Sequence, residues 1–358
     1  MDERVRQIIM RPDDTVGDAL RRMDASGGRI VLVTDENDTL RGVATDGDMR
    51  RWIIAGRKLD DPLSAAMNPR PHVLEQGFRR DNAERLMTEG HFECLPVVDP
   101  GGRVVDALWW HDLIEGRPGI RRSSLGLPVV VMAGGRGTRL APYTNVLPKA
   151  LVPIGDTPIS QLIMERFSEW GCSEFLLMLN HKANLIRAYF AELEAPFRVD
   201  CVVEPRPLGT AGALSLLAGR VGQTFFLTNC DVLVEADYES VLRAHREAGN
   251  EITLVASMKQ FTIPYGVCEV GEGGRLTGIT EKPSFDHLVS TGLYVVEPQV
   301  LDEIPRDTAC DMTDLIGGCL ERGRRLGVYP VSEGAWLDMG ALDPLRDMRE
   351  RLGAGQRD

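Results

Sequence analysis

The chain has 358 residues, which is long for one domain and favours two. Hydrophobic residues make up 43% and charged residues 26%, as in globular proteins, and the net charge of -12 does not suit a protein that wraps nucleic acid. No stretch approaches the roughly 18–20 apolar residues that span a membrane, and the N-terminus lacks the layout of a signal peptide. The seven cysteines are scattered without CxxC spacing, which argues against disulfides or a zinc site. We therefore expect a cytoplasmic protein with a small-molecule substrate and no nucleic acid or membrane partner.

Residues 1–115 contain an internal duplication with an offset of 64 residues. Each copy is predicted to run as helix, apolar strand, Gly-containing turn, second strand and second helix, and two such units should pack as a pair. The copies span about 1–60 and 61–115. The matching positions are Ala19 and Ala83, Met23 and Met87, Val31–Asp35 and Leu95–Asp99, and Asp48 and Asp112. Residues 116–127, rich in Gly, Ser, Arg and Pro, are predicted to be a linker before a second domain at 128–358.

The duplicated region resembles a tandem pair of CBS domains, of α+β type. The first copy carries Thr45-x-x-Asp48, which fits the pattern with which such domains hold a ribose and a phosphate. The second copy has Trp109 at the Thr position, followed by Asp112. The resemblance implies an adenine nucleotide at Thr45 and Asp48, and a purely structural role of the pair stays open beside it.

A phosphate-binding loop is predicted at the start of the second region. The apolar strand Pro128–Met132 leads into a Gly-rich loop, where glycines let backbone N–H groups approach anionic oxygens. The loop lacks the Lys-Ser/Thr pair of a Walker motif, and Leu140 replaces the third Gly of a dinucleotide fingerprint. The predicted nucleotide-binding residues here are Ala133, Gly134, Gly135, Gly137 and Thr138.

The longer string AGGRGTRLAPYTNVLPKALVPI resembles the signature of nucleoside-diphosphate-sugar pyrophosphorylases. These enzymes join a sugar-1-phosphate to the α-phosphorus of a nucleoside triphosphate and release pyrophosphate. Two anions must meet, so positioning and charge neutralisation dominate catalysis. The resemblance places Arg139 and Lys149 on the triphosphate and the leaving pyrophosphate as catalytic residues.

The next elements alternate between helix and strand. Asp156, Thr157 and Pro158 are predicted to open a helix, with Pro158 in its first turn, and Gly171 to close it. Strands are expected at Glu174–Leu179 and Val199–Val203. The order predicts an α/β fold with a Rossmann-like, mixed but mostly parallel sheet covered on both faces. The family resemblance makes this sheet similar to that of GT-A proteins.

In this family the segment from Glu204 to Gly212 lies against the nucleobase. Glu204 stands where a side chain reads the base, and a carboxylate acceptor suits the two donors of guanine. Gly209 stands where the backbone faces the base. The alternative for Glu204 is a solvated loop carboxylate.

Two aspartates are predicted as magnesium ligands by the same resemblance. Asp231 follows the apolar strand Phe225–Thr228, at the edge of a parallel sheet where ligands bind. Its expected partner is Asp338, and two carboxylates suit the oxygen shell of Mg²⁺. Each aspartate alone is more typical of a cap or a turn.

Three further motifs meet the sugar phosphate in this family. Lys282 is expected to hold the phosphate and Glu281 the sugar hydroxyls, with Gly266, Thr291 and Gly292 lining the pocket. The resemblance extends from about Pro128 to Leu345, and no hexapeptide-repeat tail follows.

The combined pattern resembles CBS-containing sugar nucleotidyltransferases of bacterial surface-glycan pathways. It implies GTP and either glucosamine-1-phosphate or mannose-1-phosphate as substrates, Mg²⁺ as cofactor and a homo-oligomer. Two alternatives remain. A GT-A-type glycosyltransferase would normally show Asp-x-Asp, where this chain has Asn229 before Asp231. A non-catalytic nucleotide sensor would not need to keep the phosphate loop.

Overall fold

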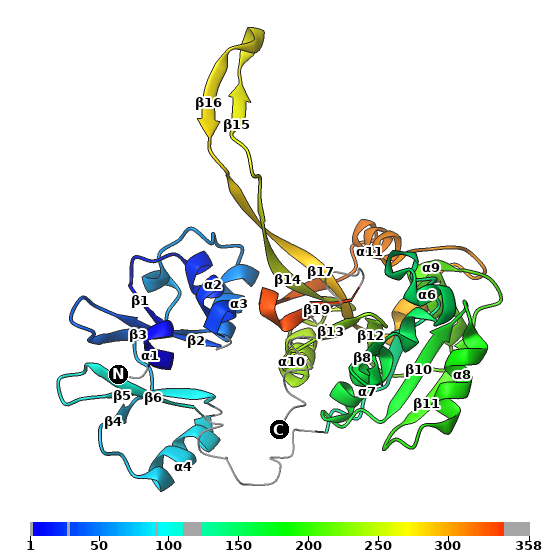
Figure 1. Ribbon diagram of the computed structural model, residues 1–358, viewed down its shortest axis with the longest axis horizontal. Helices are drawn as coiled ribbons and strands as arrows, with labels where there is room; N and C mark the ends of the chain where they lie inside the picture. Colours follow the sequence, from blue (N-terminus) through cyan, green and yellow to red (C-terminus); the bar gives the residue numbers. More distant parts are fainter. Residues whose placement is uncertain (1–2, 27–28, 91, 110–123, 340–358) are drawn as a thin grey trace. The chain divides into compact units, whose positions relative to one another are not determined.

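The computed structural model describes residues 3–26, 29–90, 92–109 and 124–339 (Figure 1). The chain forms two compact units, one of residues 1–121 with 330–334 and one of residues 122–329 with 335–358. Most of the predicted linker, and Asp112 of the second copy, lie outside the described residues. In the described ranges, no helix has both the length and the apolar character needed to cross a membrane.

The first unit contains two copies of one small fold, as the duplication predicts. The elements of the first copy are α1 (Glu3–Gln7), β1 (Ile9–Met10), α2 (Val16–Ser26), β2 (Ile30–Thr34), β3 (Leu40–Thr45) and α3 (Asp46–Ile54). Those of the second are β4 (Leu74–Glu75), α4 (Arg80–Gly90), β5 (Cys94–Val98) and β6 (Val104–Trp109). Each three-stranded sheet has a parallel and then an antiparallel pair. The register repeats with the offset of 64, because Ile30 pairs with Thr45 and Cys94 with Trp109.

The two copies meet through equivalent positions. The amide of Leu40 donates to the carbonyl of Gly102, and the amide of Val104 donates to the carbonyl of Asp38, at 2.9 and 3.0 Å. Positions 40 and 104, and positions 38 and 102, are again 64 residues apart. This reciprocity shows that the copies are related by a local twofold axis.

The second unit begins with the strand of the phosphate loop. Its helices are α6 (Tyr143–Val146), α7 (Ile159–Ser168), α8 (Ala183–Glu192), α9 (Gly209–Gly212), α10 (Tyr238–Ala248) and α11 (Met312–Glu321). Its strands are β7 (Val129–Met132), β8 (Pro153–Ile154), β9 (Thr157–Pro158), β10 (Glu174–Leu179), β11 (Arg198–Val203), β12 (Phe225–Asn229), β13 (Val232–Val234), β14 (Ile252–Thr262), β15 (Val267–Val270), β16 (Leu276–Thr280), β17 (Ser284–Val296), β18 (Leu326–Val331) and β19 (Trp336–Asp338).

A seven-stranded sheet forms the centre of this unit, in the order β11-β10-β7-β12-β17-β14-β18. The strands β11, β10, β7 and β12 are parallel, and β17 is antiparallel to both β12 and β14. The predicted α/β fold with a mixed, mostly parallel sheet is therefore confirmed. The strand predicted at Glu174–Leu179 is β10 itself, and β11 begins one residue before the predicted strand.

Both faces of the sheet are covered, and the alternation along β12 shows how. Phe225 lies in a core cluster with Leu214, from the segment between α9 and β12, and with Leu315 of α11. Phe226 points to the other face, where its ring centroid lies 5.2 Å from that of Phe167 on α7 and 5.7 Å from that of Tyr238 on α10. Burying large apolar side chains on both faces is a main source of stability here.

One predicted helix start is wrong by a position. Pro158 was expected inside the first turn, after a capping side chain, but it is itself the N-cap residue of α7 and ends β9. Residues 153–158 form the short β8–β9 hairpin, and its pairing holds Pro158 extended, with φ -60° and ψ 143°.

A long two-stranded arm projects from the sheet (Figure 1). The strands β14 and β17 pair without a break from Ala256–Ser290 to Thr262–Ser284, and β15 and β16 continue the ribbon to its tip. We refer to residues 259–288 as the arm.

Candidate active site

The predicted phosphate loop is held at the end of β7 by its neighbours on both sides. The amide of Ala133 donates to the carbonyl of Met178 on β10, and the amide of Cys230 donates to the carbonyl of Met132. Gly137 adopts φ 64°, and a Cβ there would lie within 3.0 Å of side-chain atoms of Thr144 and Lys149. Only glycine fits both requirements, so Gly137 sets the path of the loop.

The two arginines of the loop face solvent. Arg136 and Arg139 are exposed, as are Gly135 and Thr138. Within the described ranges, no carboxylate pairs with either arginine. In a chain of net charge -12, this loop therefore presents local positive charge to an anion.

Lys149 and Asp231 form the most strongly buried ion pair at this edge. Lys149 Nζ lies 2.5 Å from Asp231 Oδ2, and both side chains are mostly buried. Lys149 follows the loop that Gly137 sets, and Asp231 follows β12, so the ion pair joins two segments far apart in the sequence. Burial raises the pKa of the adjacent Cys230 thiol to about 12, which excludes this cysteine as a thiolate nucleophile near neutral pH.

The structure brings Asp338 next to Asp231. In the antiparallel pair of β13 and β19, Asp338 is opposite Val232, the residue after Asp231. The amide of Met339 also donates to the carbonyl of Asp231 at 2.8 Å. Two carboxylates from neighbouring segments are suitable donors for a hard divalent cation.

Glu204 is buried rather than solvated, so the alternative of a solvated loop carboxylate is wrong. Its Oε2 accepts the amide of Leu208 at 3.0 Å, and its Oε1 lies beside Gly134, where a Cβ would overlap it. Burial raises the pKa of this carboxyl, and the bond from the Leu208 amide partly offsets that effect. Glu204 thus joins the loop after β11 to the phosphate loop, and reading of the base stays a prediction.

Gly209 has a structural reason to be glycine. It adopts φ 78°, and a Cβ would overlap the carbonyl of Cys310 and the carboxylate of Asp311. The contact of its backbone with a base stays a prediction.

Thr291 and Gly292 lie at an irregularity in β17, close to the end of β12. The ladder passes from Val255–Leu293 to Ala256–Ser290, so these two residues form a bulge. The hydroxyl of Thr291 donates to the carbonyl of Val255 at 2.8 Å, and this residue is only 2% exposed. Gly292 adopts φ 85° against the side chain of Asn229. Thr291 therefore supports the bulge, and contact with a sugar phosphate stays a prediction.

The other three predicted sugar-phosphate residues lie on the arm. Gly266, Glu281 and Lys282 are exposed, and the Lys282 amide donates to the carbonyl of Tyr265. Lys282 and Thr291 are nine positions apart, which is about 30 Å of extended strand. The structure brings the predicted nucleotide and metal residues together at the sheet edge, but it does not bring these three residues to them.

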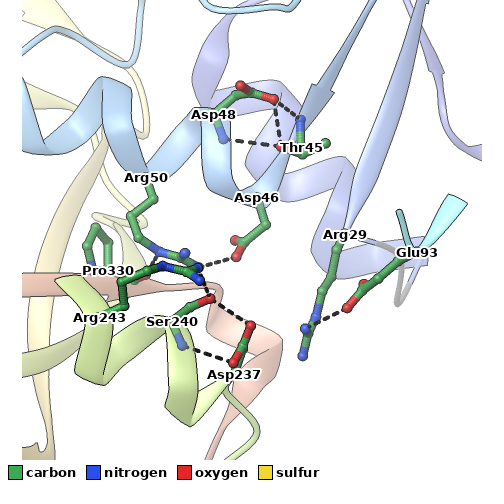
Figure 2. A network of polar contacts seen from close by, with 10 residues as sticks. All are labelled: Arg29, Thr45, Asp46, Asp48, Arg50, Glu93, Asp237, Ser240, Arg243 and Pro330. Atoms are coloured by element: carbon green, nitrogen blue, oxygen red, sulfur yellow. Dashed lines mark hydrogen bonds and ion pairs between the residues drawn. The ribbon is translucent and has the colours of Figure 1, made fainter. Parts of the chain in front are cut away.

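In the first unit, Thr45 and Asp48 form a capping box at the start of α3 (Figure 2). The Asp48 amide donates to Thr45 Oγ1 at 3.2 Å, and Asp48 Oδ2 accepts the Thr45 amide at 2.8 Å. Arg51 pairs with the other oxygen of Asp48 at 2.6 Å. Thr-x-x-Asp before a helix is also a capping signature. Both side chains thus have a structural role whether or not a nucleotide binds.

Two supporting residues were not singled out from the sequence. The Thr144 hydroxyl donates to the Gly137 carbonyl at 2.8 Å, and Lys182 Nζ donates to the carbonyls of Thr144 and Asn145. The TNVLPK string contains Thr144, but nothing in the sequence near Lys182 indicates that it reaches this segment.

Comparison with known proteins gives two family matches. The model described as nucleotidyl transferase matches residues 128–354, more than half of the chain, and the CBS domain model matches residues 5–55. The second copy lies outside this CBS match, and its strand register repeats that of the first copy.

Similar curated proteins include a probable mannose-1-phosphate guanylyltransferase 1 of Oryza sativa subsp. japonica, 30% identical over 224 residues, and mannose-1-phosphate guanylyltransferase 1 of Arabidopsis thaliana, 29% identical. Another is a UTP–glucose-1-phosphate uridylyltransferase of Synechocystis sp., 27% identical over 237 residues. Each alignment covers 60% of this chain, and the chain spans 61% of the length of each relative.

Among solved structures, HddC from Yersinia pseudotuberculosis has a TM-score of 0.51 and is 22% identical, with 63% of this chain and 99% of that chain covered. At this identity the likeness shows the fold of the second unit.

Proposed function

The chain belongs to the nucleotidyl transferase family, and on that premise we propose that it is a sugar-1-phosphate nucleotidyltransferase. An oxygen of the sugar-1-phosphate attacks the α-phosphorus of a nucleoside triphosphate. The bond from that phosphorus to the α,β-bridging oxygen breaks, and its electron pair leaves with pyrophosphate. The products are a nucleoside-diphosphate sugar and pyrophosphate, and no covalent enzyme intermediate is needed.

The observation that carries this proposal is the junction of the loop and the sheet edge. Gly137 packs directly against Lys149, and Lys149 Nζ is 2.5 Å from Asp231, so one buried cation links the phosphate loop to the end of β12. In the proposed reaction, the ammonium of Lys149 and the exposed guanidinium of Arg139 bind phosphate oxygens. Their charge stabilises the pentacoordinate arrangement and the leaving pyrophosphate.

Asp231 and Asp338 are suited to hold Mg²⁺, because both offer hard carboxylate oxygens from adjacent segments. The ion, when bound, supplies positive charge that offsets the phosphates. Lys149 already binds one oxygen of Asp231, so it fixes the rotamer of that carboxylate before any ligand arrives.

GTP is the proposed nucleotide, with mannose-1-phosphate or glucosamine-1-phosphate as the sugar. The two plant relatives are named mannose-1-phosphate guanylyltransferases, which supports GTP. Glu204 is also buried next to Gly134 of the loop, where its carboxylate has a fixed position. Guanine offers two donors to such an acceptor. The uridylyltransferase relative makes UTP the competitor to test.

The CBS pair is proposed to bind an adenine nucleotide and adjust this activity. Binding to Thr45 and Asp48 would have to use the atoms of their capping box, so a ligand there would be coupled to the start of α3. The proposed reaction consumes a nucleoside triphosphate, for which we propose a cytoplasmic location.

The test is pyrophosphate release with Mg²⁺ from the full chain. GTP, ATP, CTP, UTP and dTTP are each combined with mannose-1-phosphate, glucosamine-1-phosphate, glucose-1-phosphate and N-acetylglucosamine-1-phosphate, with and without AMP or ATP as effector. We expect release only when GTP and one hexose-1-phosphate are both present. Asp231→Asn is the matched control, because it keeps the shape of the side chain and removes its charge. No release from any pair, with or without effector, would overturn the proposal.

A further inference from the structure

The loop that contains Gly209 is held by a segment far away in the sequence. Residues 208–212, which we call the Gly209 loop, contact residues 308–311, the pre-α11 segment, which leads into α11. The amide of Cys310 donates to the carbonyl of Leu208 at 2.9 Å, and the carbonyl of Cys310 accepts the amides of the last two loop residues, each at 2.9 Å. One residue of the pre-α11 segment therefore binds both ends of the loop.

Thr210, in the middle of the loop, is bound by the side chain of Asp311. Asp311 Oδ1 accepts the Thr210 amide at 3.1 Å and the Thr210 hydroxyl at 3.4 Å. The oxygen of the same hydroxyl accepts the amide of Met312, the first residue of α11, at 2.9 Å. Leu208, the residue before α9, has no polar side chain with which to cap that helix. Asp311 and the Cys310 carbonyl therefore satisfy amides that the start of a helix leaves unpaired.

Both glycines of the loop are explained by the same segment. A Cβ at Gly209 would lie 2.6 Å from the carbonyl oxygen of Cys310, and a Cβ at Gly212 would lie 2.5 Å from that of Thr308. Gly212 has ordinary helical dihedral angles, φ -58° and ψ -35°, so the close approach of the two backbones is what requires glycine there. The loop sequence is thus fitted to the pre-α11 segment.

These contacts leave one backbone donor of the loop for a ligand. The Leu208 amide donates to Glu204 Oε2, and the amides of residues 210–212 donate to the pre-α11 segment. Among the described residues, the Gly209 amide has no acceptor, and Gly209 is exposed. The amide that stays available is therefore the one at the position predicted to face the base.

We propose that Asp311 is a positioning residue for recognition of the nucleobase. Its carboxylate, together with the Cys310 carbonyl, holds the Gly209 loop so that the Gly209 amide faces an acceptor atom of the base. This role rests on the proposed function, in which the loop lies against the base, and Asp311 acts through the loop. A donor that is displaced by about 1 Å no longer meets its acceptor at hydrogen-bond distance, so the effect on binding is direct.

Asp314 provides a matched control on the same helix. Asp314 Oδ2 accepts the amide of Asp311 at 3.1 Å, so both aspartates support the start of α11. Within the described ranges, Asp311 is the one of the two that contacts the Gly209 loop. A role limited to the stability of α11 would make the alanine variants of both residues behave alike.

The first test is binding of GTP and of UTP to the full chain with Mg²⁺, measured by isothermal titration calorimetry. For the nucleotide that wild type binds more tightly, Asp311→Ala is expected to raise the Kd about tenfold, as the loss of one hydrogen bond to a ligand does. Asp311→Asn keeps a side-chain oxygen and is expected to stay within about threefold of wild type, and Asp314→Ala is expected to leave the Kd unchanged.

Thr210→Val tests the same contact from the side of the loop. It removes the hydroxyl that joins Asp311 to Met312 and keeps the shape of the side chain, so it is expected to raise the Kd about threefold, even if Asp311→Ala does not fold. Wild-type affinity in Asp311→Ala or in Thr210→Val overturns the proposal. An equal loss of affinity in Asp311→Ala and Asp314→Ala also overturns it, and so does a wild type that binds neither nucleotide.

Steady-state kinetics give a second readout. In Asp311→Ala, the KM for the nucleoside triphosphate is expected to rise about tenfold while the KM for the sugar phosphate stays the same. A similar rise in both constants overturns a role in recognition of the base. If wild type binds a nucleotide but releases no pyrophosphate, the proposed function fails, and the nucleotide affinities of the variants still decide the role of Asp311.

Discussion

The sheet edge and the arm both carry residues predicted to bind substrates, but they hold them in different ways. At the edge, Gly137, Lys149 and Asp231 are packed against one another, and each has a backbone or side-chain reason for its position. On the arm, Glu281 and Lys282 are exposed on a two-stranded ribbon. Preorganised groups are the ones that stabilise a transition state most effectively. The difference indicates that the residues predicted to bind the nucleotide are preorganised, whereas Glu281 and Lys282, predicted to bind the sugar phosphate, are not.

The largest loss of activity is expected at Lys149, and its absence would contradict the contrast between the sheet edge and the arm. Lys149→Met removes the cation from the phosphates and leaves the buried Asp231 unpaired, so we expect pyrophosphate release to fall about a thousandfold. Lys182→Met is the matched control, because it loses hydrogen bonds to the carbonyls of Thr144 and Asn145 without touching Asp231. We expect that control to lose less than about tenfold in activity. Similar losses in both variants would contradict a specific role of Lys149.

Gly137 tests whether the loop is truly preformed. Gly137→Ala places a Cβ at φ 64° and against Thr144 and Lys149, so we expect a loss of about 2 kcal/mol in unfolding free energy. Gly135→Ala is the comparison, because a Cβ there meets no atom within 4 Å. Denaturant unfolding of both variants measures the difference. Equal free energies of unfolding for the two variants would show that the loop adjusts to a Cβ at position 137 and is not preformed.

A variant of Lys282 tests whether the arm binds the sugar phosphate. Because the side chain is exposed, Lys282→Met is expected to leave the melting temperature unchanged. If it binds the sugar phosphate, the KM for that substrate rises about tenfold while the KM for the triphosphate stays the same. Steady-state kinetics with each substrate varied in turn decides this. An unchanged KM for the sugar phosphate would remove Lys282 from the site.

A smaller effect is expected in the first unit. Asp48→Ala removes the side chain that accepts the Thr45 amide, which should cost about 1 kcal/mol of stability as lost helix caps do. Thr45→Ala should cost a similar amount, because it removes the other half of the capping box. Thermal melts with and without AMP measure both effects. Stabilisation by AMP that survives in both variants would place the nucleotide elsewhere.

The smallest effect concerns the carboxyl of Glu204 and pH. The pKa of this carboxyl is raised in the folded state, so its ionised form lowers the free energy of unfolding. That loss is present at neutral pH, and it fades as the pH falls through the raised pKa toward the ordinary value of 4.5. Glu204→Gln keeps an acceptor for the Leu208 amide and carries no charge. We expect the variant to melt at a higher temperature than wild type at pH 7, with the gap closing under acid conditions. A difference in melting temperature that widens in acid would contradict a raised pKa of Glu204.

The periodicity of apolar residues and the turn residues in the sequence predicted most of the fold. The strand at Glu174–Leu179 and the repeat of 64 residues follow from local apolar patterns, and the structure reproduces both. The start of α7 was misplaced because residues 153–158 pair as a hairpin, which local capping signals do not reveal.

The site was predictable only where a motif is contiguous. The loop from Ala133 to Lys149 is one string, whereas the reason for glycine at position 137, its φ of 64° and its packing against Thr144 and Lys149, is visible only in the structure. The positions of Glu281 and Lys282 on a long ribbon were not predictable, because they depend on pairing between β14 and β17 over many residues. The burial of Glu204 likewise depends on contacts across the sheet.

The twofold relation inside the first unit brings two unlike side chains together. Arg29 and Glu93 occupy equivalent positions in the two copies and form an ion pair of 3.1 Å (Figure 2). Two identical copies related by the same axis would place like charges at this point, and these would repel each other. The two copies are therefore not interchangeable here, and their difference favours the pairing of unlike partners, by a small amount because both side chains are largely exposed.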